Sequence, residues 1–175
     1  AKFASKPYKS RDKLATCPME IVHMDLCGPY ETPSFSGCKF AIGILDEHTS
    51  YGDAMPLKTK AEAKFWAIKT INEWETKSGY KCQKVKFDRG GEFLNKVLAE
   101  FFALKGIIVD ATPGYCHESN GRAERLMRTM NNQVRSMLYH YLYEHPFRNQ
   151  LWAEALRYAM YTRNCSLVRD RPATP

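Results

Sequence analysis

The sequence of 175 residues contains no apolar run of the roughly 18 residues that a membrane-spanning helix needs, so it predicts no such helix. Its first residues lack the apolar segment of a signal peptide. Internal repeats and low-complexity tracts are also absent. No two cysteines have the close spacing of a structural zinc site, so we expect no zinc in this fragment. We interpret the six as reduced thiols: Cys17, Cys27, Cys38, Cys82, Cys116 and Cys165.

The composition is that of a globular domain with an excess of positive charge. Hydrophobic residues make up 44% of the chain, and 26 Lys and Arg stand against 19 Asp and Glu, which gives a formal net charge of +7. This balance favours a polyanionic partner, either nucleic acid or an anionic membrane surface. The plain alternative is a soluble domain that happens to be basic.

Hydrophobic periodicity and turn residues predict nine elements. Strands are expected at 19–27, 39–46, 51–57, 81–87 and 107–110, and helices at 60–78, 94–105, 119–143 and 148–164. Gly79 is expected to end the first helix, and Pro146 follows the third. The order βββαβαβαα predicts an α/β protein with a mixed five-stranded sheet flanked by helices, which is the order of a ribonuclease-H-like fold.

Each helix carries an apolar stripe that we expect to face the sheet. The first helix has Ala61, Phe65, Ile68, Ile71 and Trp74, and the second has Leu94, Leu98, Phe101 and Leu104. The third has Met127, Met130, Val134, Met137, Leu138 and Tyr141, and the fourth has Leu151, Trp152, Ala155, Leu156 and Ala159.

Three carboxylates stand in distinctive contexts: Asp25 in HMDLCGP, Asp88 in KFDRGGEF and Glu124 in SNGRAER. Taken singly, each has an ordinary interpretation, as a solvent-facing strand residue, a turn residue and a helix-surface residue. Taken together they fall late in the first strand, after the fourth strand and in the first turns of the long helix. In the expected fold these places meet at one end of the sheet.

Three neighbouring carboxylates repel one another unless cations neutralise them. An all-oxygen site without His or Cys selects Mg²⁺ or Mn²⁺. Two such ions, roughly 3.5–4 Å apart, activate an attacking oxygen and stabilise a leaving oxygen in displacement at phosphorus. The sequence therefore predicts a two-metal polynucleotidyl transferase. Asp46, Asp53, Glu92 and His23 are interpreted as structural residues.

The three motifs resemble the catalytic core of retroviral-type integrases, and most of all those of copia-type (Pseudoviridae) long-terminal-repeat retrotransposons. Asp88 and Glu124 are separated by 35 residues, as in that family's DDE motif, and NGRAER is similar to its NG-x-AER signature. The resemblance implies that Asp25, Asp88 and Glu124 are catalytic and bind two Mg²⁺ or Mn²⁺ ions, with Asp25 bridging both. The implied reactions are 3′-end processing and strand transfer, with possible endonuclease activity.

The resemblance also implies contacts with DNA. It places Tyr115, Asn120, Gly121, Arg125 and Arg128 near the DNA end, although local packing, helix capping and a solvated basic helix face are alternative roles. His117 stands where relatives commonly have proline. Glu118 is a competing acid, but it breaks the 35-residue spacing and the AER context, so Glu124 is preferred.

The expected organisation is a linker at 1–18 from a missing N-terminal zinc domain, an integrase catalytic core at 19–165 and the start of a C-terminal linker at 166–175. Expected partners are element-end and target DNA and a homodimer or higher oligomer, with no membrane. The expected location is the nucleus, after a cytoplasmic virus-like particle.

Two other functions stay open from the sequence. One is a domesticated, non-catalytic module that binds DNA or protein on the same scaffold. The other is a ribonuclease-H-type nuclease, which usually needs a fourth carboxylate on the first helix, where Glu62, Glu73 and Glu75 lie.

Overall fold

The computed structural model describes residues 14–88, 96–112, 121–142, 144–167 and 174–175, and of Asp88, Ala111, Thr112 and Tyr141 the backbone alone. Its strands are β1 (Ile21–Cys27), β2 (Phe40–Asp46), β3 (Gly52–Leu57), β4 (Lys84–Asp88) and β5 (Ile108–Thr112). Its helices are η1 (Lys60–Glu62), α1 (Ala63–Ser78), α2 (Lys96–Lys105), α3 (Gly121–Tyr141), η2 (Arg148–Leu151) and α4 (Trp152–Asn164). The predicted order of strands and α-helices is confirmed.

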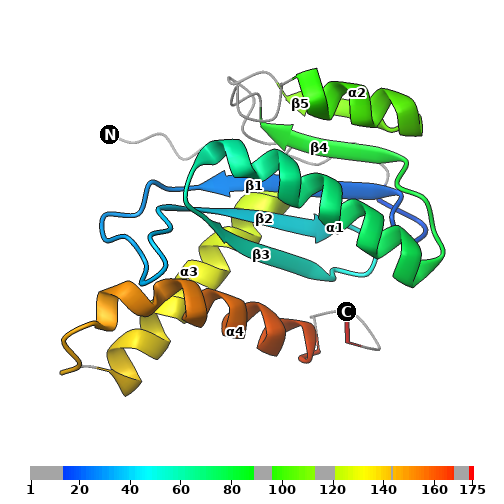
Figure 1. Ribbon diagram of the computed structural model, residues 1–175. Coiled ribbons are helices and arrows are strands. Elements are labelled where there is room, and N and C mark those ends of the chain that lie inside the picture. Colours follow the sequence, from blue (N-terminus) through cyan, green and yellow to red (C-terminus); the bar gives the residue numbers. More distant parts are fainter. Residues whose placement is uncertain (1–13, 89–95, 113–120, 143, 168–173) are drawn as a thin grey trace, which may run out of the picture.

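The five strands form one mixed sheet in the order β3-β2-β1-β4-β5 (Figure 1). Strands β1, β2 and β3 are an antiparallel meander, whereas β4 and β5 run parallel to β1. A short polar turn joins β2 to β3, whereas a longer segment, residues 28–39, joins β1 to β2. The parallel part requires the crossover helices α1 and α2. The result is the predicted α/β architecture, consistent with a ribonuclease-H-like fold.

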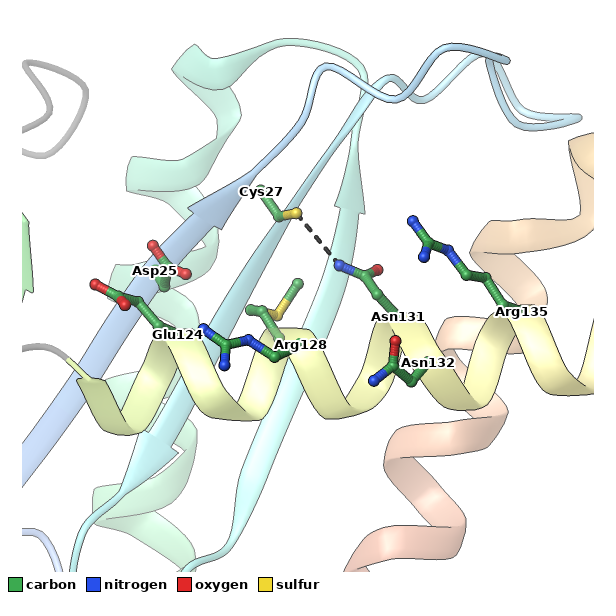
Figure 2. A pocket seen from close by; sticks show the side chains of 8 residues that line it. Asp25, Cys27, Glu124, Arg128, Asn131, Asn132 and Arg135 are labelled. Atoms are coloured by element: carbon green, nitrogen blue, oxygen red, sulfur yellow. Dashed lines mark hydrogen bonds between the residues drawn. The ribbon is translucent and has the colours of Figure 1, made fainter. Parts of the chain in front are cut away.

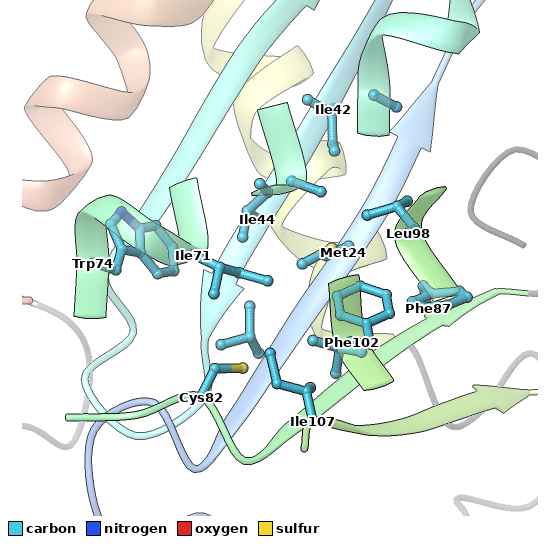
Figure 3. Packing of buried hydrophobic residues seen from close by; sticks show 14 of the residues in the cluster. Met24, Ile42, Ile44, Ile71, Trp74, Cys82, Phe87, Leu98, Phe102 and Ile107 are labelled. Carbon is cyan, nitrogen blue, oxygen red and sulfur yellow. The ribbon is translucent and has the colours of Figure 1, made fainter. Parts of the chain in front are cut away.

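Two hydrophobic layers cover the two faces of the sheet. Alternate strand residues such as Met24, Ile42 and Phe87 pack with α1 and α2 (Figure 3). The opposite alternation turns Ala41 and Leu45 toward α3 and α4. Because strand side chains alternate between faces, β1 presents Val22 and Met24 to one layer, and His23 and Asp25 to the opposite face of the sheet. Asp25 therefore lies on the face that α3 covers.

The inner face of α1 differs from the predicted stripe. Ala61 is exposed, and the Phe65 side chain is 58% exposed, so both were wrongly expected to face the sheet. The α-helix begins at Ala63, after the 3₁₀ turn η1, and buries Ala63 and Ala67 together with the predicted Ile71 and Trp74. Small alanines let the helix approach the sheet closely. Gly79 ends α1 in the left-handed conformation, as expected.

The stripe of α2 also differs from the prediction at its end. Leu104 is 89% exposed, whereas Phe102 is buried beside Leu98. Leu98 and Phe102 are one helical turn apart, so they lie on the same face, while Leu104 falls outside it. Leu94 lies outside the described residues. None of the helices in the described ranges is long and apolar enough to cross a membrane.

Candidate active site

Asp25 lies on the α3-facing side of β1, between the core residues Met24 and Leu26. Its side chain is partly buried, and its Oδ1 accepts a hydrogen bond from the backbone N–H of Leu26 at 3.0 Å. Strand β1 is central in the sheet, paired with β2 on one side and β4 on the other. The Asp25 carboxylate therefore stands on a strand that is held from both sides.

Glu124 lies in the first turns of α3, beside the residues that anchor this helix to the sheet. Ala123, Leu126 and Met127 are buried, while Glu124 is partly buried at the margin of the apolar face. Met127 packs over Gly43, the residue opposite Asp25 on β2. This close approach brings the start of α3 near Asp25.

The two carboxylates line one pocket of about 320 Å³. Figure 2 shows Asp25 and Glu124 together at one end of it and Arg135 at the other. Between them the pocket is lined by Cys27, Met127, Arg128, Asn131 and Asn132. The pocket thus combines acids that attract cations with guanidinium and amide groups that suit a phosphate-bearing ligand.

Asp88 is the last residue of β4, at the same level of the sheet as Asp25. Met24 and Phe87 are paired across β1 and β4, and Asp25 and Asp88 are the residues that follow them. The third predicted carboxylate is therefore on the strand adjacent to Asp25, although its side chain lies outside the described part. Among the described side chains, no three His, Cys, Asp or Glu residues form a metal-binding group.

A second contact holds the middle of α3. The Tyr30 hydroxyl donates a hydrogen bond to Oδ1 of Asn131 at 2.8 Å, and the amide of Asn131 lies 3.4 Å from the Cys27 sulfur. The Tyr30 ring packs on Trp152 with ring centroids 4.2 Å apart. Burial and the neighbouring Cys27 raise the pKa of Tyr30 above its ordinary value, so it stays a neutral donor. Asn131 is thereby oriented along the pocket.

Behind the carboxylates lies a buried polar chain that joins β1 to α3. His23 Nε2 lies 2.6 Å from Glu47 Oε2, and Arg122 lies 3.7 Å from Glu47 Oε1. Burial alone would raise the pKa of Glu47, but the hydrogen bond from His23 and the charge of Arg122 lower it to about 2. His23 is thus a strand residue with a partner at Nε2, as predicted, whereas its buried Nδ1 has no hydrogen-bond partner among the described residues.

The other acids interpreted as structural also have local partners. Asp46 accepts hydrogen bonds from Met19 and Thr49, and Asp53 accepts one from the backbone N–H of Ala54. Burial raises the pKa of Asp53, and the Ala54 hydrogen bond opposes this effect. Glu92 lies outside the described residues.

The structure describes three of the five residues that we predicted to contact DNA. Arg128 lines the pocket, Arg125 is exposed on the preceding turn of α3, and Gly121 is the first residue of α3. Tyr115 and Asn120 lie outside the described residues, as do His117 and Glu118. The pocket is also lined by Asn131, Asn132 and Arg135, which the sequence analysis did not single out. Their spacing from Glu124 and Arg128 places them on one face of the helix, so the sequence does contain a signal for them.

The acids of η1 and α1 do not join this pocket. Glu75 is buried beside Lys105 and Cys82, Glu73 lies 3.7 Å from Lys69, and Glu62 accepts a hydrogen bond from the backbone of Lys58. None of the three is among the described residues that line the pocket. Helix α1 also packs in the layer on the other face of the sheet from α3. The described structure therefore does not place a fourth carboxylate from α1 there.

No protein-family model matches the chain. It is 31% identical over 159 residues to the retrovirus-related Pol polyprotein from transposon TNT 1-94 of Nicotiana tabacum. That similarity covers 90% of this chain and 11% of the Pol polyprotein, so the chain corresponds to a small part of its relative. Together with the mixed sheet and its flanking helices, the similarity supports a retrotransposon integrase-like region with an α/β fold consistent with that of an integrase core.

Proposed function

We propose that the chain is the catalytic core of a retrotransposon integrase, an enzyme that processes DNA 3′ ends and joins them to target DNA. The observation that carries the proposal is the pocket in which Asp25 and Glu124, from distant parts of the sequence, lie with Arg128. The position of Asp88 at the end of the neighbouring strand supports it. A carboxylate pair beside a cationic helix face suits a phosphodiester substrate and its metal ions.

The donor set fits hard divalent cations. Carboxylate oxygens of Asp25 and Glu124, together with Asp88, would hold two Mg²⁺ or Mn²⁺ ions, because these ions prefer oxygen ligands. When bound, the ions supply activation of the attacking oxygen and stabilisation of the leaving oxygen. Arg128 would contact a phosphate, and Arg125 would contact the same strand outside the pocket.

The two reactions are displacements at phosphorus. In end processing, a water oxygen forms a bond to phosphorus, the bond to the 3′ oxygen breaks, and that oxygen takes up a proton. In joining, the 3′-hydroxyl oxygen loses its proton and attacks a target phosphorus, whose bond to its own 3′ oxygen breaks, and that oxygen takes up a proton. Asp25 and Glu124 would hold the metal ions throughout, and no covalent enzyme intermediate is required.

Several further properties belong to the same proposal. The core would occupy residues 19–165, with linkers at 1–18 and 166–175, and would act as a homodimer or higher oligomer on element-end and target DNA. Its place of action would be the nucleus, after a cytoplasmic virus-like particle. Tyr115 and Asn120 remain predicted DNA contacts.

The test is a strand-transfer assay with labelled DNA ends, using the full-length protein in Mg²⁺ and in Mn²⁺. We expect Glu124→Gln to abolish transfer, whereas the matched control Glu73→Gln, which changes an exposed acid of α1, retains it. Equal activity of Glu124→Gln and the unaltered protein would refute the site. Full-length protein that binds DNA but never joins it would favour a non-catalytic binding module, and cleavage of RNA in a hybrid would favour a nuclease.

A further inference from the structure

A row of polar contacts, buried at His23 and Glu47, connects the two elements that carry the pocket's acids. His23 precedes Asp25 by two residues on β1, and Arg122 precedes Glu124 by two residues on α3. Both contact Glu47, which follows β2 at the turn into β3: His23 at 2.6 Å and Arg122 at 3.7 Å. One carboxylate thus spans the strand and the helix immediately beside their functional residues.

Glu47 is itself held firmly in place. Its backbone N–H donates to the carbonyl oxygen of Ile21 at 2.9 Å, and its Oε1 accepts from the backbone N–H of Ala15 at 3.3 Å. The His23 and Glu47 side chains are 2% and 7% exposed, whereas Arg122 is 34% exposed. A buried charge is costly unless it is paired and hydrogen-bonded. The Glu47 carboxylate therefore favours the arrangement of β1 and α3 in which both His23 and Arg122 reach it.

The start of α3 also has apolar contacts with the sheet, and Met127 packs over Gly43. Apolar packing is non-directional, whereas the contacts of Glu47 join specific polar atoms of β1 and α3. The next residue across the sheet from His23 is Lys86, whose buried side chain lies 3.9 Å from Asp110. The polar row under the pocket therefore continues from α3 to β5.

We propose that His23, Glu47 and Arg122 are positioning residues, which set the distance between the Asp25 and Glu124 carboxylates by tying the start of α3 to β1. This inference rests on the proposed function for its chemical meaning. Groups that orient metal ligands from behind typically change metal affinity or activity by about 10- to 100-fold when they are removed. We expect effects in that range here.

The test compares Glu47→Gln with Glu75→Gln in the full-length protein. Glu75 is the matched control, because it is an equally buried acid with partners Lys105 and Lys81, and it lies in the layer on the opposite face of the sheet. Mn²⁺ binding is measured by electron paramagnetic resonance, and strand transfer is measured against Mg²⁺ concentration to give a Mg²⁺ activation constant. Both measurements are made below each variant's melting temperature. We expect Glu47→Gln to raise the Mn²⁺ dissociation constant and the Mg²⁺ activation constant at least tenfold, and Glu75→Gln to leave both constants unchanged.

Variants of Arg122 provide a second arm that does not depend on removing a buried group. Arg122→Lys keeps the positive charge and should hold Mn²⁺ affinity within about threefold, whereas Arg122→Met should match the loss in Glu47→Gln. Equal loss in the Lys and Met variants would overturn the proposal. If Glu47→Gln fails to fold, this pair decides the question.

Crystal structures separate the inference from the proposed function. We expect Glu47→Gln to move the first turn of α3 away from β1, and Glu75→Gln to leave it in place. If the unaltered protein shows no transfer but this displacement occurs, the positioning role stands and the catalytic proposal fails. An unmoved helix together with unchanged Mn²⁺ affinity would overturn the positioning role, whatever the activity.

Discussion

Asp25 on β1 and Gly43 on β2 are directly opposite each other in the sheet, and Gly43 leaves room for Met127 of α3. A Cβ atom on Gly43 would lie 2.4 Å from the Met127 sulfur, which is far inside van der Waals contact. Met127 is one turn after Glu124 on the same helix. The absent side chain at position 43 therefore lets the helix that carries Glu124 pack beside the strand that carries Asp25.

Substitution Gly43→Ala should destabilise the protein by about 1–3 kcal/mol, because an added methyl group forces Met127 and the helix to shift. Urea unfolding measures this change. The double variant Gly43→Ala with Met127→Ala should cost less than the sum of the two single variants, since the smaller residue 127 makes room for the methyl group. Strict additivity would show that the contact does not control the packing of α3.

Binding of Mn²⁺ should raise the melting temperature of the unaltered protein. Stabilisation of about 1–3 kcal/mol is expected when the cation concentration is 10 to 100 times its dissociation constant. Asp25→Asn and Glu124→Gln should be as stable as the unaltered protein without metal, because each removes one of two like charges that line one pocket. Neither variant should gain the metal-dependent increase. Differential scanning fluorimetry with and without Mn²⁺ tests this, and equal shifts in all three proteins would contradict the site.

Acid should remove the contribution of Glu47 to stability. Its pKa is lowered from an ordinary value of 4.5 to about 2, so its charged form is favoured in the folded state. That stability is complete above about pH 4.5 and is lost as the pH falls toward 2, a change of roughly 3 kcal/mol. Glu47→Gln should therefore be less stable at pH 7 and approach the unaltered protein near pH 2. Unfolding curves that stay equally far apart at every pH would contradict the assignment.

The described cysteines should differ in reactivity toward an alkylating reagent. Burial, with the nearby Glu75 charge, raises the pKa of the Cys82 thiol to about 12, so little thiolate forms at pH 8. Cys165 is exposed and should react first, whereas Cys82 should react only on unfolding. Peptide mapping by mass spectrometry after timed exposure to iodoacetamide measures the order. Early modification of Cys82 in folded protein would contradict its described burial.

Much of the fold was predictable because it depends on local patterns. Gly28-Pro29 marked the end of β1, the polar turn after Asp46 separated β2 from β3, and Gly79 marked the end of α1. Helix faces were predicted less well: the exposed Phe65 and Leu104 are apolar, and periodicity alone does not tell which apolar side chain meets the sheet. That choice depends on where each helix begins and how closely its small residues let it approach.

Motif, spacing and periodicity are properties of neighbouring residues, so they were enough to predict the order of the elements and the places of Asp25 and Glu124 within it. The folded arrangement was needed to show that Gly43 accommodates Met127, that Glu47 joins His23 to Arg122, and that Tyr30 orients Asn131. These pairs are far apart in the chain, and they meet because strand order and helix placement bring them together. Local propensity carries no information about such contacts, which arise when the two layers pack on the sheet.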